Sequence, residues 1–149
     1  MTPLNLPAFD VKVKKSEGKV LIFDTVRKKY VVLTPEEWVR QHLIHYLVHH
    51  RYYPRSLFRV EGSLTYNTLQ KRSDILIYAR DGKPWMLIEC KSSAIKLSQR
   101  AFNQAAIYNM TIGARYVAVS NGVVHYCCLA PKQGVQPEFL EEFPDFEED

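Results

Sequence analysis

The sequence lacks the segments that mark membrane proteins, secreted proteins and many metal-binding proteins. No apolar run approaches the roughly 18 residues of a membrane-spanning helix. Residues 1–7 have neither the charged start nor the apolar stretch of a signal peptide. The three cysteines (Cys90, Cys127 and Cys128) are odd in number and lack metal-ligand spacing. We therefore expect a cytoplasmic protein with reduced, buried thiols and no membrane partner.

The chain also lacks internal repeats, low-complexity tracts and an obvious linker, and it contains no GxSxG, P-loop or GxGxxG motif. A length of 149 residues is enough for one domain with its own core. We expect a single domain, residues 1–149. It would comprise an N-terminal strand extension (1–33), a core (34–130) and an acidic tail (138–149).

Charge is distributed unevenly along the sequence. The tail holds seven acidic residues and no basic one, so the rest of the chain carries all 20 lysines and arginines against nine acids. A basic body is typical of a protein that binds a polyanion. The tail is most simply a solvated terminus, and a shielding role over a basic cleft is the alternative.

Residues 74–92 contain two apolar segments joined by Arg80-Asp81-Gly82-Lys83, and Asp-Gly in this setting is a strong hairpin signal. If Asp81 and Gly82 are the two turn residues, Arg80 faces Lys83, and this register sets Asp74 directly opposite Glu89. Paired side chains point to one face of a sheet, about 5 Å apart. Lys91 follows two residues after Glu89 and shares that face.

Two facing carboxylates repel each other unless something neutralises them. A hard divalent cation such as Mg²⁺ would do so, and an adjacent lysine could orient a water for attack on phosphorus. An ordinary surface hairpin with charged ends is the alternative. Both faces of the pair are apolar, however, which predicts an interior strand pair, and charges at the end of a buried pair need a partner.

The remaining pattern predicts an α+β fold with a mixed sheet. Thr34 is a good N-cap for a helix reaching about His50, with Pro35 in its first turn and Glu37 completing a capping box. Its apolar stripe is Val39, Leu43, Tyr46, Leu47 and His50, with Glu36 on the same side and Glu37, Arg40 and Gln41 toward solvent. The other expected elements are strands at 9–14, 19–24, 29–33 and 57–69, a helix at 98–112 capped by Gly113, and a hairpin of 116–120 with 123–129.

Asp74 followed by Glu89-Cys90-Lys91 resembles the signature of the PD-(D/E)xK nuclease superfamily, although Ser73 stands where the nominal proline would be. Gln104 and Tyr108 resemble the Gln-x-x-x-Tyr motif of its RecB-like members. The start of the first helix, residues 33–41, looks like the N-terminal nuclease domain of type I restriction enzyme R subunits. The resemblance spans residues 33–129 and implies a restriction-endonuclease-like αβββαβ core.

The resemblance implies a Mg²⁺-dependent DNA endonuclease of restriction or repair type, in which Mn²⁺ can substitute. The implied metal ligands are Asp74, Glu89, the Cys90 carbonyl and Glu36. The implied catalytic residues are Asp74, Glu89, Lys91 and Gln104. The residues expected to contact DNA are Tyr108, Arg72, Lys71, Lys96 and Arg100. A homodimer, or a partner in a restriction or repair complex, would fit the two cuts that a duplex requires.

Other interpretations of these residues stay open. Capping alone accounts for both glutamates of the first helix, and Gln104 could be a core residue bonded to a loop. His42, His45 and His49 follow i, i+3, i+7 spacing, which a zinc or copper site could use, but semi-exposed helix residues are the simpler interpretation. The alternative function is a catalytically inactive nucleic-acid-binding or assembly module with a nuclease fold. A structural partner of a restriction or repair complex is a third.

Overall fold

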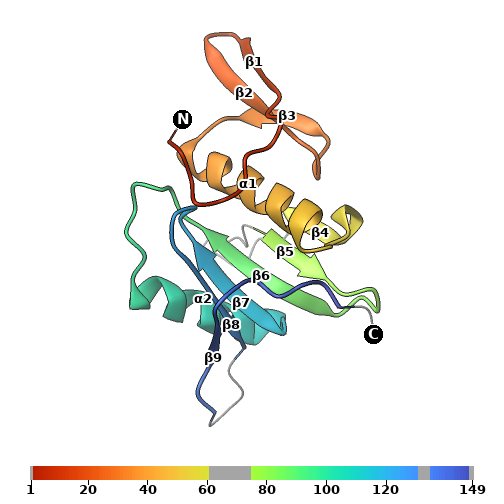
Figure 1. Ribbon diagram of the computed structural model, residues 1–149, viewed down its shortest axis with the longest axis vertical. Coiled ribbons are helices and arrows are strands. Elements are labelled where there is room, and N and C mark those ends of the chain that lie inside the picture. Colours follow the sequence, from red (N-terminus) through yellow and green to blue (C-terminus); the bar gives the residue numbers. More distant parts are fainter. Residues whose placement is uncertain (1, 61–74, 131–134, 148–149) are drawn as a thin grey trace.

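The computed structural model describes residues 2–60, 75–130 and 135–147, which form an α+β structure (Figure 1). A six-stranded mixed sheet has the order β4-β5-β6-β7-β8-β9, in which only the pair β6–β7 is parallel. A separate antiparallel sheet has the order β1-β2-β3. The strands are β1 (Val13–Ser16), β2 (Lys19–Asp24), β3 (Lys29–Val32), β4 (Phe58–Val60), β5 (Ile75–Tyr78), β6 (Pro84–Cys90), β7 (Tyr116–Ser120), β8 (His125–Leu129) and β9 (Glu138–Leu140).

Two α-helices, α1 (Pro35–His50) and α2 (Gln99–Ile112), cover opposite faces of the six-stranded sheet, and a 3-10 turn (Arg55–Leu57) precedes β4 (Figure 1). On the α1 face, Val39, Leu43 and Leu47 share a core cluster with Ile75 and Ile88. The α2 face is covered by two smaller clusters, formed by Leu76 and Leu87 with half-buried Tyr108, and by Phe102 with Val117. Strands β5 and β6 are therefore buried on both sides, as their sequence predicts.

Helix α1 begins at its predicted cap, Thr34, and α2 ends at its predicted cap, Gly113, whereas Ser98, expected as the first residue of α2, is its N-cap. The Thr34 hydroxyl accepts a hydrogen bond from the Glu37 amide at 3.0 Å, and the Ser98 hydroxyl accepts one from the Ala101 amide at 3.1 Å. Gly113 ends α2 in the left-handed region at φ 79°, a conformation that a side chain would strain. Among the described residues, no helix has the length and apolar character needed to cross a membrane.

The register of the β5–β6 hairpin is confirmed away from the loop, where Ile75 pairs with Ile88 and Ile77 with Met86, whereas Tyr78 pairs with Pro84 instead of the predicted Trp85. The predicted two-residue turn is wrong. The Ala79 amide bonds to the Lys83 carbonyl and the Gly82 amide to the Ala79 carbonyl, which leaves a three-residue loop, 80–82. A register shift between Ile77 and Tyr78 compensates for the extra loop residue. The pairing farther along the hairpin is therefore the predicted one.

The acidic tail is not the solvated terminus expected from its charge. Residues Glu138–Leu140 form β9 beside β8, and Phe143 and Phe146 are buried in the main core. The Tyr53 hydroxyl donates a hydrogen bond to the Pro144 carbonyl at 2.8 Å, and Arg51 forms ion pairs with Glu142 and Asp145. Aromatic packing and ion pairs with Arg51 thus fix the C-terminal segment against the core, although its acidic composition had suggested a solvated terminus.

Other differences from the predicted elements are small. The first strand begins at Val13 instead of Phe9, and the hairpin strand expected from Val123 begins at His125, because the Asn121 side chain accepts the amides of Val123 and Val124 in a four-residue loop. His50, placed in the apolar stripe, is exposed at the end of α1. The strand expected at 57–69 is described only as β4, and residues 61–69 lie outside the described residues.

Candidate functional site

Glu89 and Lys91 form the centre of the candidate site. Leu87 packs in the cluster on the α2 face, so alternation along β6 directs Glu89 to the same face. The Lys91 amide bonds to the Ser120 carbonyl at 2.8 Å and continues the parallel pairing with β7 past the end of β6. The Lys91 ammonium lies 3.3 Å from Glu89 Oε2. The sequence thus places an acid and a base side by side at the end of a central strand.

One oxygen of Glu89 is left without a hydrogen bond. The Glu89 side chain is 17% exposed and that of Lys91 34% exposed. The Oε2 atom itself is buried and accepts no hydrogen bond from the described part of the chain. The Lys91 ammonium pairs with this oxygen as a charge but makes no hydrogen bond to it, so the carboxylate keeps lone pairs for a further donor or cation. The donor set therefore fits a hard metal ion, which binds carboxylate and carbonyl oxygens.

The second helix contributes side chains to the same face of the sheet. Tyr108 packs against the cluster of Leu76 and Leu87. Leu87 lies two residues before Glu89 on β6. Gln104 lies one helical turn before Tyr108 and is half-buried. Lys96 and Arg100, expected to contact DNA, are exposed in the loop before α2 and in its first turn. Cys90 is buried on the α1 face, so only its backbone carbonyl could serve as a ligand.

Three residues of the predicted site cannot be placed. Asp74, Arg72 and Lys71 lie outside the described residues, so the facing carboxylates remain a prediction. Within the described ranges, no group of three or more histidine, cysteine, aspartate or glutamate side chains gathers as metal ligands do. This finding includes the histidines of α1. His42 bonds through Nδ1 to the Trp38 carbonyl, and His45 stacks on Phe9 with ring centroids 3.9 Å apart.

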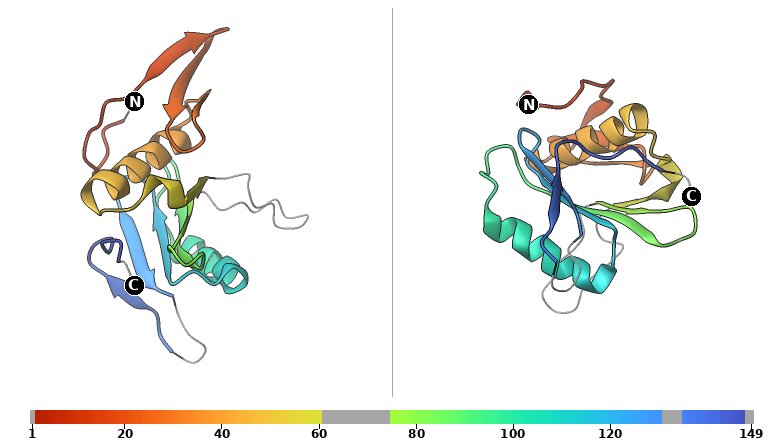
Figure 2. Two further views of the ribbon diagram at one scale, coloured as in Figure 1. Left: turned by 90° about the vertical axis from the view of Figure 1, so that its right-hand side faces the viewer. Right: turned by 60° about the horizontal axis from the view of Figure 1, so that its bottom comes forward.

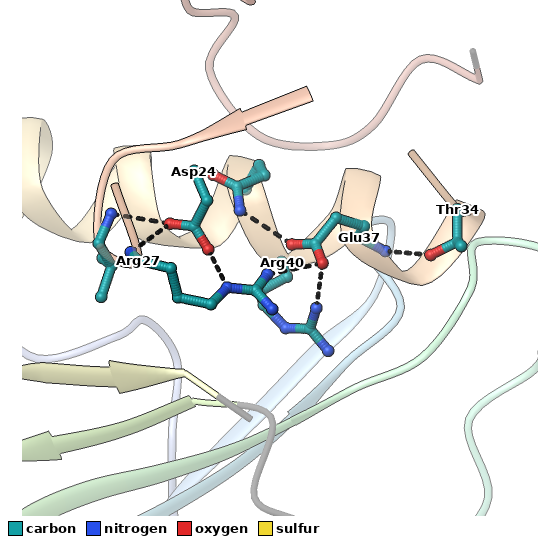
Figure 3. Close-up of polar contacts among 7 residues, drawn as sticks. Asp24, Arg27, Thr34, Glu37 and Arg40 are labelled. Carbon is teal, nitrogen blue, oxygen red and sulfur yellow. Dashed lines mark hydrogen bonds and ion pairs between the residues drawn. The ribbon is translucent and has the colours of Figure 1, made fainter. Parts of the chain in front are cut away.

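The prediction for the first helix is wrong about which glutamate is buried. Glu36 is exposed, whereas Glu37 is only 5% exposed. Glu37 Oε1 accepts hydrogen bonds from Arg27 at 2.8 Å and Arg40 at 2.6 Å, and Oε2 accepts one from Gln41 at 2.9 Å (Figure 3). Arg40 and Gln41 are buried as well, although they were expected to face solvent. Arginines already neutralise the carboxylate that the helix turns inward.

The partner of Glu37 comes from the N-terminal extension. Asp24, at the end of β2, is fully buried and accepts hydrogen bonds from the amides of Val26 and Arg27 and from the Arg27 side chain (Figure 3). Burial disfavours the charge on Arg27, but its hydrogen bonds to Asp24 and Glu37 outweigh burial and raise its pKa. We call Asp24, Arg27, Glu37, Arg40 and Gln41 the buried charge cluster. It joins the β2–β3 turn to α1.

Buried histidines predict a loss of stability in acid. Burial lowers the pKa of His45 from 6.5 to about 4, with His49, Arg55 and His42 adding to the effect. Burial also lowers the pKa of His42 and of His125. The unfolded chain takes up these protons near pH 6.5 and the folded chain only at lower pH. The free energy of unfolding should therefore fall as the pH decreases from 6.5 toward 4.

Urea unfolding across this pH interval checks the expectation. A His45→Gln variant should show a shallower decrease, whereas His50→Gln, at an exposed position on the same helix, should keep the slope of the original chain. Equal slopes in all three proteins would contradict the assignment to His45.

Most of the chain, including the segment that holds Glu89 and Lys91, lies within a region that matches a known family. The model of the family described as type I restriction enzyme R protein N terminus matches residues 35–144, which include both helices and the whole six-stranded sheet. No curated protein matches the chain. The matched region covers well over half of the sequence. The chain therefore belongs to the family of N-terminal domains of type I restriction enzyme R proteins.

Proposed function

We propose that the chain is a Mg²⁺-dependent DNA endonuclease of restriction or repair type. The observation that carries the proposal is the pair of Glu89 and Lys91, which end the central strand β6 with one buried carboxylate oxygen lacking a hydrogen bond. Membership in a nuclease-related family supplies the class of reaction. The proposed reaction is hydrolysis of a phosphodiester bond.

The order of elements supports a restriction-endonuclease-like core. Helix α1 precedes β4, β5 and β6, and α2 then crosses to β7, which pairs parallel with β6. This order is the αβββαβ arrangement that the PD-(D/E)xK resemblance implies. In it, β6 occupies an interior position between β5 and β7. A side chain at the end of such a strand is held by neighbours on both sides.

We assign the metal to Asp74, Glu89 and the Cys90 carbonyl. The confirmed pairing of Ile75 with Ile88 supports this set, because Asp74 and Glu89 are the next residues outward in the same register. Glu36 is left out of the set because it is exposed, and Glu37 because both its oxygens accept hydrogen bonds from the buried charge cluster. Bound Mg²⁺, or Mn²⁺ in its place, supplies Lewis acidity and a water of lowered pKa.

The chain's own groups have separate roles in the proposal. The Lys91 ammonium has three N–H donors and would hold the attacking water and a non-bridging phosphate oxygen beside Glu89. Gln104 and Tyr108, on the same face of the sheet, would orient the strand to be cut. Four cationic residues would contact neighbouring phosphates: Arg72, Lys71, Lys96 and Arg100.

Replacing Glu89 by glutamine tests the proposal. Purified protein is incubated with supercoiled plasmid in Mg²⁺, in Mn²⁺ and in EDTA, and thermal unfolding is recorded under the same conditions. We expect metal-dependent nicking by the original chain and none by Glu89→Gln. Metal at ten times its Kd should stabilise the original chain by about 1.4 kcal/mol and leave the variant unchanged.

Glu141→Gln is the matched control, because this exposed glutamate lies on the segment after β9 and is no part of the proposed site. It should behave as the original chain does. Nicking that is equally fast in Glu89→Gln would contradict the proposal.

The second candidate function is a DNA-binding or assembly module without turnover. The half-burial of Glu89 and Lys91 favours the enzyme. An ion pair that served only to bind DNA would lie on the surface and would not bury a carboxylate oxygen. Binding of DNA without cleavage under every metal condition would favour the module.

A homodimer or a restriction-complex partner would supply the second cut in a duplex. Three buried free cysteines support the proposed cytoplasmic location.

A further inference from the structure

Within the described part of the chain, one face of the N-terminal sheet is covered by no other helix or strand. The β1–β3 sheet extends from α1 on the side away from the six-stranded sheet, as Figures 1 and 2 both show. Ile22 and Asp24 are fully buried, and Asp24 joins the buried charge cluster against α1. Because side chains alternate along a strand, the residues between them point away from α1. That opposite face carries Lys12, Lys14, Lys19, Leu21, Phe23, Tyr30 and Val32, and we call it the lysine face.

The lysine face combines apolar surface with positive charge. Tyr30 is 36% exposed and Val32 47% exposed. The Lys14 ammonium lies 4.1 Å from the centroid of the Tyr30 ring, and Lys12 lies 5.9 Å from that of Phe23. Cation–π contacts of this kind hold the ammonium groups above the sheet instead of letting them spread into solvent. The described strands place no acidic residue on this face.

The extension as a whole is strongly basic once its buried charges are set aside. Asp24 and Arg27 neutralise each other inside the cluster. The exposed charged residues that remain in residues 2–34 are two acids, Asp10 and Glu17, and six lysines. These lysines are Lys12, Lys14, Lys15, Lys19, Lys28 and Lys29. A concentration of exposed lysines on a small sheet is the electrostatic footprint of a polyanion-binding surface.

We propose that the lysine face binds the sugar–phosphate backbone of DNA, with Lys12, Lys14 and Lys19 contacting successive phosphates. The inference rests on the proposed function for the identity of the polyanion. It assigns a role to residues 12–32, which lie before the matched region 35–144. Contacts of this kind position a duplex and carry no sequence information. The sheet would hold the DNA that flanks the cleavage site.

The test measures binding without catalysis. A fluorescein-labelled duplex is titrated with the full chain in EDTA, and anisotropy is followed over a series of NaCl concentrations. In the triple variant Lys12→Gln, Lys14→Gln and Lys19→Gln, three lost phosphate contacts should reduce the slope of log K against log salt by about 2 to 3. Affinity at low salt should fall by at least about tenfold.

Two further variants make the result specific. The control is a second triple variant, which combines Lys15→Gln, Lys29→Gln and Lys83→Gln and removes the same total charge from exposed positions. Lys15 and Lys29 lie on the other face of the same sheet. This control should keep most of the affinity and slope. Replacing the three lysines of the lysine face by arginine should keep binding, because positive charge at these positions is retained.

Three results would overturn the proposal. The first is unchanged DNA binding by the lysine-face variant. The second is an equal loss in the control variant, which would mean that only net charge matters. The third is loss of binding to phosphatidylserine vesicles with DNA affinity intact, which would assign the face to an anionic membrane. Because the assay contains no divalent metal, absence of nuclease activity would leave its outcome unaffected.

Discussion

Replacement of Glu37 by alanine is expected to lower the free energy of unfolding by about 3–5 kcal/mol, the range found when one partner of a buried ion pair is removed. Glu37 accepts hydrogen bonds from Arg27, Arg40 and Gln41 and is 5% exposed. Without its carboxylate, the guanidinium of Arg40 stays buried at the same site with reduced compensation. Typical domains are stable by 5–15 kcal/mol, so the variant should be only marginally folded. Urea unfolding followed by circular dichroism measures the difference.

The adjacent glutamate is the natural control. Glu36→Ala removes the same group from an exposed position in the same helical turn and should change stability by no more than about 0.5 kcal/mol. Similar losses in the two variants would mean that the buried charge cluster contributes nothing beyond the helix's first turn. A double variant, Glu37→Ala with Arg40→Ala, should recover part of the loss, because it also removes the buried guanidinium that Glu37 otherwise neutralises.

Lys91→Ala is expected to reduce the rate of Mg²⁺-dependent cleavage by about 10²- to 10⁴-fold, the range for a positioned group that assists proton transfer. The ammonium lies 3.3 Å from Glu89 Oε2 at the end of β6, and the proposal gives it the task of holding the attacking water. The rate is measured in single turnover with plasmid, so that product release does not enter. DNA affinity in EDTA should change by only a few fold, because one phosphate contact is lost at most.

Lys83→Ala is the matched control for this experiment. Lys83 is exposed at the loop that joins β5 to β6, at the other end of the same strand pair. It should cleave as the original chain does. Cleavage by Lys91→Ala at the original rate would remove Lys91 from the mechanism, whereas equal loss of binding and cleavage would reduce its role to holding DNA.

The sequence predicted best those features that neighbouring residues determine. Capping by Thr34, the end of α2 at Gly113 and the apolar character of both faces of β5 and β6 each depend on a few adjacent positions. The hairpin register was predicted correctly although its turn was not, because a bulge at Ile77 and Tyr78 offsets the longer loop.

The sequence failed where the partner of a residue is distant in the chain. Glu37 is buried because Arg27 reaches it from the β2–β3 turn, and no pattern within the helix reveals an arginine ten residues earlier. A possible signal was the spacing of Glu37, Arg40 and Gln41, which i, i+3, i+4 geometry places on one side. The C-terminal segment was misjudged in the same way, since its acids outnumber the two phenylalanines that enter the core.

Trimming the protein to the region shared with its family would remove residues that stabilise that region from outside it. A fragment starting at residue 35 would lack Thr34, the cap of α1, and also Asp24 and Arg27, leaving the Glu37 carboxylate without the guanidinium that reaches it from outside the helix. One ending at residue 144 would lack Phe146, whose ring packs at a tilt against both Tyr53 and Trp85. Expression of this domain as an isolated unit thus requires flanks on both sides of the shared region, and comparisons of activity between fragments should hold those flanks constant.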